Sequence, residues 1–291
     1  MRIEHPYENL SGGHWLRGNL HTHTTRSDGT RDLQATIHEY ASHEHDFLMI
    51  SDHDIYTSAE DYAKVDASGL VLIPGTELTA AGPHLLHVNP DRLQRPHPQR
   101  QRILREASEY QGFLIACHPN WQGSFNHCTL EQLMEWDGYA GMEIYNGVIG
   151  RLEGSPYALD KWDLLLSHGR RVWGFANDDS HLASDVARGW NVVYATQRTA
   201  GAIAGAMAAG CFYASTGVII SSIHVDDNRI HIKTRNAERI VALQQLARRF
   251  AVVDRDSIEV EVPQDATYVR FECWGRGERF AWTQPFFVRR D

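Results

Sequence analysis

The stretch RGNLHTHTTRSDG, at residues 17–29, begins as an apolar strand and ends in residues of the kind that bind metal ions. In an extended strand, positions i and i+2 point to the same side, so His21 and His23 can hold one cation between them. Asp28 comes five residues after His23. An isolated His-x-His pair is weak support for a site, so its meaning depends on the residues at the ends of the other strands.

Short apolar runs alternate with amphipathic segments through residues 1–216. The runs predict strands at 14–20, 47–50, 70–73, 84–88, 113–116, 142–145, 172–175 and 191–194. The segments between them predict helices at 31–44, 157–168 and 199–209. Because strands that alternate with helices form parallel sheets, this order predicts a parallel α/β sheet, open or closed into a barrel.

The pattern changes after about residue 217. Apolar residues alternate at 223–225 and 230–232 on either side of an Asp227-Asn228 turn, which predicts a hairpin. Residues 258–262 alternate in the same way, whereas 238–250 fit either a helix or a strand. We therefore expect two domains, an α/β domain at 1–216 and a small antiparallel β domain at 217–291.

The composition argues against several classes of function. The chain has 291 residues and a formal charge of −9, which argues against binding long nucleic acid or an anionic membrane surface. No apolar run approaches the roughly 18 residues needed to span a bilayer, and the first ten residues do not resemble a secretory signal. The four cysteines contain no Cys-x-x-Cys pair. We expect a cytoplasmic globular protein.

Histidine is the residue type that stands out. The chain has 17 histidines, and fifteen of them precede residue 182. Neutral imidazole is the commonest metal ligand, so this segregation indicates a metal site. Ligand-type residues stand at the end of one predicted strand after another, at His21 and His23, Asp52-His53-Asp54, Glu77, His84 and His87, His118, and Asp178, Asp179 and His181. In a parallel α/β barrel such strand ends converge on one face, where active sites lie.

These motifs together resemble a known family. RGNLHTHTTRSDG, with ISDHD, GTEL, HLLHV, ACHP and NDDSH, is similar to the polymerase and histidinol phosphatase (PHP) family of metal-dependent phosphoesterases, over most of residues 14–216. MEIYNG and the terminal AWTQPFFV further resemble a subgroup with an appended C-terminal β domain. The resemblance implies an α/β fold of the PHP type, a distorted seven-stranded β/α barrel, with a centre of two or three metal ions.

Carried over motif by motif, the resemblance implies three groups of ligands. The first is His21, His23, Glu77 and Asp179; the second is Glu77, as a bridge, with His84 and His118; the third is Asp28, His53 and His181. Mixed nitrogen and oxygen ligands suit Zn, Mn or Fe, and the sequence does not choose among them.

Two of these assignments involve a choice between neighbours. His84 is preferred to His87 because of its interval from Glu77, and Asp179 is preferred to Asp178 because the family motif is Asp-x-His. We expect the remaining acids of these motifs, Asp52 and Asp178, to support the ligands from behind, with Asp52 orienting the imidazole of His53.

The expected activity is hydrolysis of a small anionic phosphorylated molecule. Three divalent ions outweigh three carboxylates, so an acidic chain can still present a cationic pocket. A hydroxide bridging two metals would attack phosphorus, with Glu77, Asp28 and His181 as catalytic residues. The candidates for contact with the substrate are Arg26, Arg151, Arg188 and Asn146.

Other functions stay open. Metal-bound hydroxide also attacks carbonyl carbon, so an amide or carbamate hydrolase is the alternative. A non-catalytic metal-binding module is disfavoured because the ligand set is complete. The β domain could cap the barrel, support a homo-oligomer or shape one wall of the pocket.

Several further residues carry weaker expectations. Glu143 could line the pocket or make ordinary hydrogen bonds, Trp121 could line the pocket, and Cys117 is expected to be packed. Histidines in loops or on helix surfaces are expected to be exposed, namely His5, His38, His43, His45, His97, His127 and His168.

Overall fold

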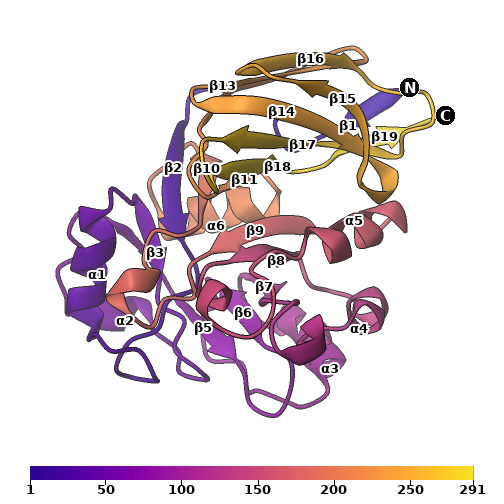
Figure 1. Ribbon diagram of the computed structural model, residues 1–291. Helices are drawn as coiled ribbons and strands as arrows, with labels where there is room; N and C mark the ends of the chain where they lie inside the picture. Colours follow the sequence, from indigo (N-terminus) through magenta and orange to yellow (C-terminus); the bar gives the residue numbers. More distant parts are fainter. Residues whose placement is uncertain (291) are drawn as a thin grey trace.

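The computed structural model describes residues 1–290. Figure 1 shows an α/β part, which carries the helices, below a part built from antiparallel strands. The helices are α1 (Leu33–Ser42), α2 (Ala59–Tyr62), α3 (Arg100–Glu106), α4 (Leu130–Glu135), α5 (Leu159–Ser167) and α6 (Ala200–Ala208). The 3-10 turns are η1 (Ala107–Glu109), η2 (Gly123–Phe125), η3 (Val148–Arg151), η4 (Ala183–Asp185) and η5 (Gln245–Ala247).

One open sheet lies wholly in the α/β part. Its order along the sheet is β5 (Gly75–Leu78), β6 (Leu85–Val88), β7 (Phe113–Ala116), β8 (Gly141–Asn146) and β9 (Trp173–Asn177). β5, β6 and β7 pair antiparallel, and β7, β8 and β9 pair parallel. The short link between β5 and β6 leaves no room for a crossover helix, so these two strands form a hairpin.

The largest sheet runs from the α/β part into the β part. Its order is β1 (Arg2–Glu4), β19 (Phe286–Arg289), β17 (Tyr268–Gly275), β18 (Phe280–Thr283), β11 (Phe212–Ser215), β10 (Trp190–Ala195), β2 (His14–Asn19), β3 (Phe47–Met49) and β4 (Val71–Ile73). β14 (Ala237–Gln244) joins it beside β17 and carries β15 (Arg248–Val253). A three-stranded sheet completes the β part, with β12 (Ile220–Asp226), β13 (Arg229–Thr234) and β16 (Ser257–Glu261).

The α/β class and the antiparallel tail are as expected, but the prediction of a parallel sheet is wrong in part, because β5–β6–β7 and β2–β10–β11 pair antiparallel. The seven-stranded barrel is not confirmed, because the sheets do not close. Between β9 and β10 the side chain of Asn191 replaces a strand ladder, since it bonds both the N–H (3.1 Å) and the carbonyl (2.9 Å) of Ala176. On the other side, the backbone pairing of β5 with the chain after β3 is limited to the isolated bridges His53–Glu77 and Thr57–Gly75.

The strands and helices predicted from the sequence are present. Three details of the structure either differ from that prediction or settle a point that it left open. Glu77 lies within a strand, β5, and not in the loop after one. The ambiguous segment 238–250 is the hairpin of β14 and β15. The hairpin expected around Asp227-Asn228 is confirmed as β12 and β13. The domain boundary between residues 216 and 217 stays a prediction. Strand β1, at the N-terminus, pairs with β19, near the C-terminus (Figure 1).

Helix α1 connects the core to the predicted site. Asp32 caps it by accepting a hydrogen bond from the N–H of Ala35 (2.8 Å). Its inner face buries Ile37 and Tyr40 completely. The Tyr40 hydroxyl donates to Asp178 (2.9 Å), so the helix reaches the segment that carries the last predicted ligands. His45, expected to be exposed, is 6% exposed, because it packs edge-on against Tyr40.

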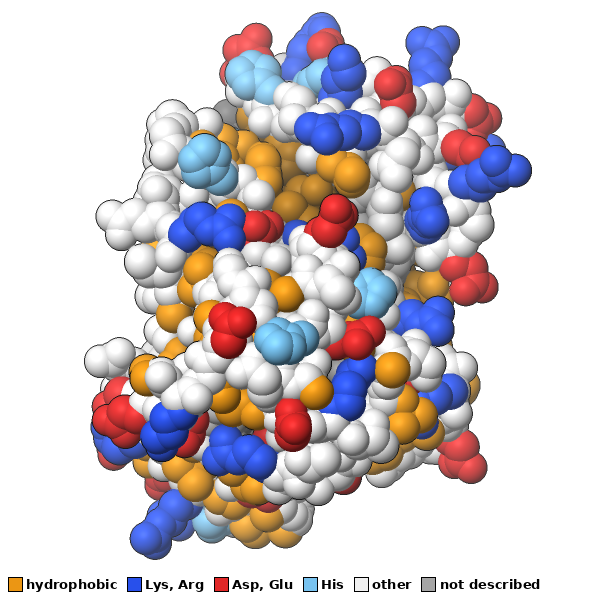
Figure 2. All heavy atoms as spheres, turned by 90° about the vertical axis from the view of Figure 1, so that its left-hand side faces the viewer, with side chains coloured by type: hydrophobic (Ala, Val, Ile, Leu, Met, Phe, Trp, Pro, Cys, Tyr) orange, Lys and Arg blue, Asp and Glu red, His pale blue; other side chains and the backbone are white. Residues whose placement is uncertain are grey.

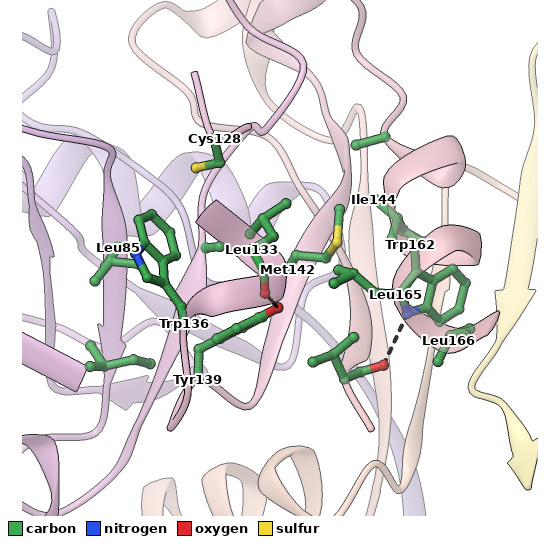
Figure 3. Close-up of a cluster of buried hydrophobic side chains, with 14 of the residues drawn as sticks. Leu85, Cys128, Leu133, Trp136, Tyr139, Met142, Ile144, Trp162, Leu165 and Leu166 are labelled. Carbon is green, nitrogen blue, oxygen red and sulfur yellow. Dashed lines mark hydrogen bonds between the residues drawn. The ribbon is translucent and has the colours of Figure 1, made fainter. Parts of the chain in front are cut away.

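The outer face of the five-stranded sheet is covered by α4 and α5 (Figure 3). Trp162 of α5 is fully buried and donates its indole N–H to the carbonyl of Val172 (2.9 Å). Tyr139 donates its hydroxyl to the carbonyl of Leu133 (2.6 Å). Both large aromatic side chains therefore bury their rings without leaving a polar atom unpaired, which keeps this side of the sheet rigid. No helix in the part of the chain described is both long and apolar enough to cross a membrane.

A buried ion pair joins the two parts. Arg270 on β17 contacts Asp163 on α5 through two nitrogens, Nε at 2.8 Å and Nη2 at 2.6 Å. Its third contact is Glu272, 2.9 Å from Nη1. The Arg270 side chain is 1% exposed and that of Asp163 is 5% exposed. Removing one partner would leave a buried charge without compensation, which is costly.

We therefore expect Asp163→Ala to lower the free energy of unfolding by about 3–5 kcal/mol, measured by denaturant titration. The matched control is Glu259→Ala, because Glu259 pairs with Arg229 on the surface, where an ion pair contributes about 1 kcal/mol or less. Equal effects of the two substitutions would contradict the structural role of the buried pair.

Candidate metal centre

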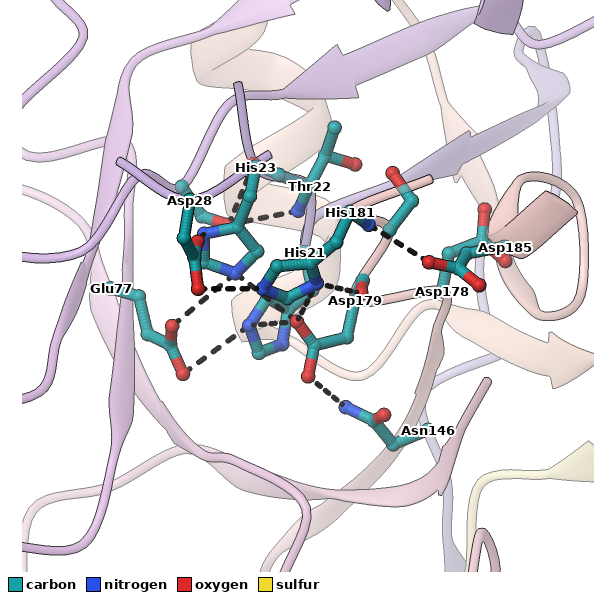
Figure 4. A network of polar contacts seen from close by, with 12 residues as sticks. His21, Thr22, His23, Asp28, Glu77, Asn146, Asp178, Asp179, His181 and Asp185 are labelled. Carbon is teal, nitrogen blue, oxygen red and sulfur yellow. Dashed lines mark hydrogen bonds and ion pairs between the residues drawn. The ribbon is translucent and has the colours of Figure 1, made fainter. Parts of the chain in front are cut away.

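All nine residues predicted as metal ligands lie in one connected cluster, drawn in part in Figure 4. They come from the ends of β2, β3, β7 and β9, from β5 and from the residue before β6. Glu77 is at the centre and is fully buried. The sequence predicts that these separate segments of the chain converge on one place, and in the structure they do.

The first group presents four atoms to a common point. His21 Nε2 and His23 Nε2 lie 3.2 and 3.1 Å from Asp179 Oδ1. The same two nitrogens lie 3.3 and 3.4 Å from the oxygens of Glu77. Ligands about 2.0–2.1 Å from a tetrahedral ion are separated by roughly 3.3 Å, so the spacing matches such a shell.

These atoms also lack any other partner. His21 Nε2, His23 Nε2, Asp179 Oδ1 and one oxygen of Glu77 are buried and make no hydrogen bond within the described chain. A buried unpaired polar atom costs about 1–3 kcal/mol, and four of them facing one another need a common partner. The residues therefore fit a divalent cation.

The second group surrounds the other side of Glu77. Its Oε1 atom lies 2.9 Å from His84 Nδ1 and 3.3 Å from His118 Nε2. His87 is elsewhere, bonded through Nε2 to the carbonyl of Gln111 (3.1 Å), so the geometry agrees with the choice of His84.

The expectation that His127 is exposed is wrong. The residue is 9% exposed, and its ring packs against those of His84 and His118. Its Nε2 accepts the backbone N–H of His84 (2.9 Å), so it holds the segment that carries this ligand. The sequence held no sign of this contact, because His127 lies in an irregular loop with no strand before it.

The third group lies at the mouth of the site. Asp28 Oδ2 is 3.4 Å from His53 Nε2 and 3.3 Å from His181 Nε2. The side chain of Asp28 is 54% exposed, whereas that of His53 is 28% exposed. This group is therefore the one that solvent and substrate reach first.

Electrostatics favour positive charge in the cluster. Burial alone would lower the pKa of His53, but its contacts with Asp28 and Glu77 outweigh burial and raise the pKa to about 10. Burial would raise the pKa of Glu77, but the surrounding histidines, His21 foremost, hold it well below its usual range. Both shifts show that the carboxylates here favour positive charge nearby, which a divalent ion would supply.

Glu143 on β8 supports two of the ligands from behind. Its Oε1 accepts the Nδ1–H of His21 (2.8 Å), which turns Nε2 toward the cluster. Its Oε2 accepts the backbone N–H of His118 (2.7 Å). The sequence left its role undecided between lining the pocket and ordinary hydrogen bonding; its 1% exposure and these contacts make it an orienting residue.

Asn146 and Asp52 make contacts different from those expected. Asn146 donates to Glu143 (2.7 Å) and Asp179 (3.2 Å), so it faces protein carboxylates. Asp52 bonds the N–H of Thr24 and the hydroxyl of Ser27, both at 2.7 Å, and thereby holds the turn after His23. No bond from Asp52 to the His53 ring occurs among the described residues.

Asp178 supports the segment after β9. It accepts the backbone N–H groups of Ala187 (2.8 Å), Arg188 (2.7 Å) and Gly189 (2.8 Å). Burial raises the pKa of Asp178 to about 6 despite these bonds. Asp178 therefore faces away from the cluster while the next residue, Asp179, faces into it.

The cluster opens into a cavity of about 350 Å³. Three apolar residues of the segment around η3, Val148, Ile149 and Leu152, form part of its wall, together with Trp121 as the sequence suggested. Of the three candidate arginines only Arg151 lines it. Arg26 instead contacts Thr57 (3.0 Å), and Arg188 bonds the carbonyl of Ser184 (2.9 Å).

Comparison with solved structures identifies the fold. A two-domain protein from Bacteroides vulgatus ATCC 8482, which contains a predicted PHP-like metal-dependent phosphoesterase, superposes with a TM-score of 0.57 at 16% identity, over 99% of this chain and 90% of that one. A protein from Bifidobacterium adolescentis ATCC 15703, described as a metal-dependent phosphoesterase, has a TM-score of 0.45 at 18% identity, over 56% of this chain and 87% of that one.

The first likeness confirms, at the level of the fold, the resemblance to a PHP-like protein with an additional domain. No family model and no curated protein matches the chain. The activity therefore has to be inferred from the residues of the site.

The contacts of Glu143 lead to a prediction. Every group that bonds its carboxylate is a donor, so Glu143→Gln would place an amide N–H against another N–H. We expect the affinity for Zn²⁺ or Mn²⁺ to fall about 10–100-fold with the fold retained, measured by titration of the metal-free protein. Glu135→Gln, on the exposed end of α4, is the control, and equal affinities in the two variants would contradict the orienting role.

Proposed function

We propose that the chain is a PHP-type metal-dependent hydrolase that cleaves a small phosphorylated molecule at a centre of two or three divalent ions, Zn, Mn or Fe. The observation that carries the proposal is the set of four buried, unpaired ligand atoms that face one another around Glu77 and Asp179. The fold shared with a two-domain PHP-like protein agrees with it.

The ions would supply Lewis acidity, which lowers the pKa of bound water and neutralises charge on phosphoryl oxygens. The chain's own residues set where this happens. Glu77 is shared by the first and second groups and would keep their two ions adjacent. Asp28 and His181 lie at the open side of the cluster and would act next to the reacting phosphoryl group.

The cavity indicates the size of the substrate. Its volume of about 350 Å³ is at the lower end of the range for small-molecule pockets. Trp121, Ile149 and Leu152 give it an apolar wall opposite the ligands. This combination suits a small phosphoester with an apolar or ring-containing leaving group.

Arg151 is the cation we propose to meet the phosphate. It is held by Asp185 through two bonds, Nε to Oδ1 and Nη2 to Oδ2, both at 2.8 Å. This pairing leaves part of the guanidinium free, and the side chain is 41% exposed where it lines the cavity. Asp185 thus pre-orients Arg151 for an anionic ligand.

The first test is a substrate panel with the Mn- or Zn-loaded protein. Nucleotides, sugar phosphates and aryl carbamates separate phosphoester from carbonyl chemistry, and we expect release of phosphate. Glu77→Ala should reduce turnover to the uncatalysed rate and reduce the metal content, measured by elemental analysis, because five histidine contacts are lost with it. Turnover of carbamates alone, or full activity of Glu77→Ala, would contradict the proposal.

The second test concerns Arg151. We expect Arg151→Ala to raise KM for a phosphoester about tenfold or more, with a smaller change in kcat, since a ground-state contact with the anion is removed. Arg229→Ala, in the β part, is the control because its side chain pairs with Glu259 on the surface. An unchanged KM would exclude Arg151 as the phosphate contact.

A further inference from the structure

A second and larger cavity, of about 770 Å³, lies where the α/β part meets the β part. Strands β2, β10 and β11 form its floor, and the chain between β11 and β12 forms one side. Figure 2 shows, in the upper half of this face, a recess with a hydrophobic floor, with both Lys or Arg and Asp or Glu side chains near its rim. It shares no lining residue with the cavity of the metal centre.

The charged side chains of this cavity are mainly arginines. Arg17, Arg188, Arg235 and Arg279 line it, against one acid, Glu278. Among residues 1–290 none of these four guanidinium groups forms a salt bridge. A cationic cluster with a single acid in its lining, in a chain of net charge −9, marks a place suited to an anion.

Arg17 gives the strongest indication. Its Nε atom is buried and has no hydrogen-bond partner in the described chain. The nearby Asp46 does not pair with the guanidinium, because it bonds the backbone N–H of Arg17 (2.9 Å) and Arg198 (2.7 Å). A buried charged donor left without an acceptor is costly, which favours a ligand that supplies an acceptor oxygen here.

Aromatic rings line the same space. The guanidinium of Arg17 lies 3.6 Å from the ring centre of Trp190. Trp15 stands against Tyr213 at 5.4 Å between ring centres. Flat aromatic walls bind planar rings through stacking and through burial of apolar surface.

A glycine makes room for one of the arginines. Gly217 has φ +143, and a Cβ on it would come within 2.8 Å of Arg279 Cδ. The side chain of Arg279 therefore crosses Gly217 at the cavity wall. Any larger residue at this position would displace Arg279.

We propose that this cavity is a second ligand site, for a small phosphate ester that carries a planar ring, of the nucleoside monophosphate class. Arginine forks match phosphate oxygens, and the two tryptophans match a base. The volume lies within the range of small-molecule sites and exceeds that of the metal-centre cavity.

Two connections lead from this site to the metal centre. β2 carries Trp15 and Arg17, and the chain continues directly to His21 and His23. Ala187 and Arg188 line the cavity, and their backbone N–H groups bond Asp178, which precedes Asp179. A ligand here would contact the segments that position the first group of ligands.

The test uses the full chain after removal of metal ions by chelation, so that binding does not depend on catalysis. AMP and UMP are titrated by calorimetry and by the fluorescence of the tryptophans. We expect one equivalent to bind, with adenosine and inorganic phosphate each binding at least tenfold more weakly. Binding should be the same in Arg151→Ala, because the exposed Arg151 lines the metal-centre cavity and not this one, which separates this site from the proposed hydrolytic one.

Substitutions of arginines in the cavity wall test whether the nucleotide binds in this cavity. Arg235 and Arg279 are exposed, so the double variant Arg235→Ala/Arg279→Ala should fold normally and weaken binding at least tenfold. Arg276→Ala is the matched control, because Arg276 is exposed on the same β17–β18 turn as Arg279 and does not line the cavity. Dissociation constants above about 1 mM for both nucleotides, or equal binding by the double variant, would overturn the proposal.

Discussion

One buried carboxylate organises this molecule. The side chain of Glu77 is fully buried, and its two oxygens lie within 3.4 Å of nitrogens of five histidines. Burying an ionised carboxylate costs several kcal/mol unless positive charge compensates it. The segments that carry these histidines must therefore meet at β5, and the surrounding sheets have to leave a space of the right size at that point.

The backbone is strained at two residues of the candidate metal centre. Asp179 has φ 55 and His118 has φ 29, values that residues other than glycine rarely adopt. Each strained residue is held by a hydrogen bond, from Asp179 N–H to the carbonyl of His21 (2.9 Å) and from His118 N–H to Glu143 (2.7 Å). Strain of about 1–3 kcal/mol at such residues persists only where the surroundings enforce it, which is typical of functional sites. Their side chains would point elsewhere with an extended backbone.

The candidate ligands could be identified from the sequence because most of them stand next to a short apolar strand, within a local motif. The supporting residues Glu143 and His127 could not be predicted in this way, because their roles depend on contacts with His21 and His84, which are far away in the chain. The failure of the barrel to close has the same origin. The side chain of Asn191 bonds across the gap between two strands, and nothing in the local pattern around residue 191 distinguishes this from a ladder of backbone bonds.

The β part is not a separate attachment to the α/β part. β1 from the start of the chain pairs with β19 near its end, and Arg270 of β17 is buried against Asp163 of α5. Because β10 and β11 continue the sheet of β2 into β18, the two parts share one layer of strands. The arginine cavity lies along this shared layer, so its shape depends on both parts. Strand β2 therefore links this shared layer to His21 and His23, which come directly after it in the chain.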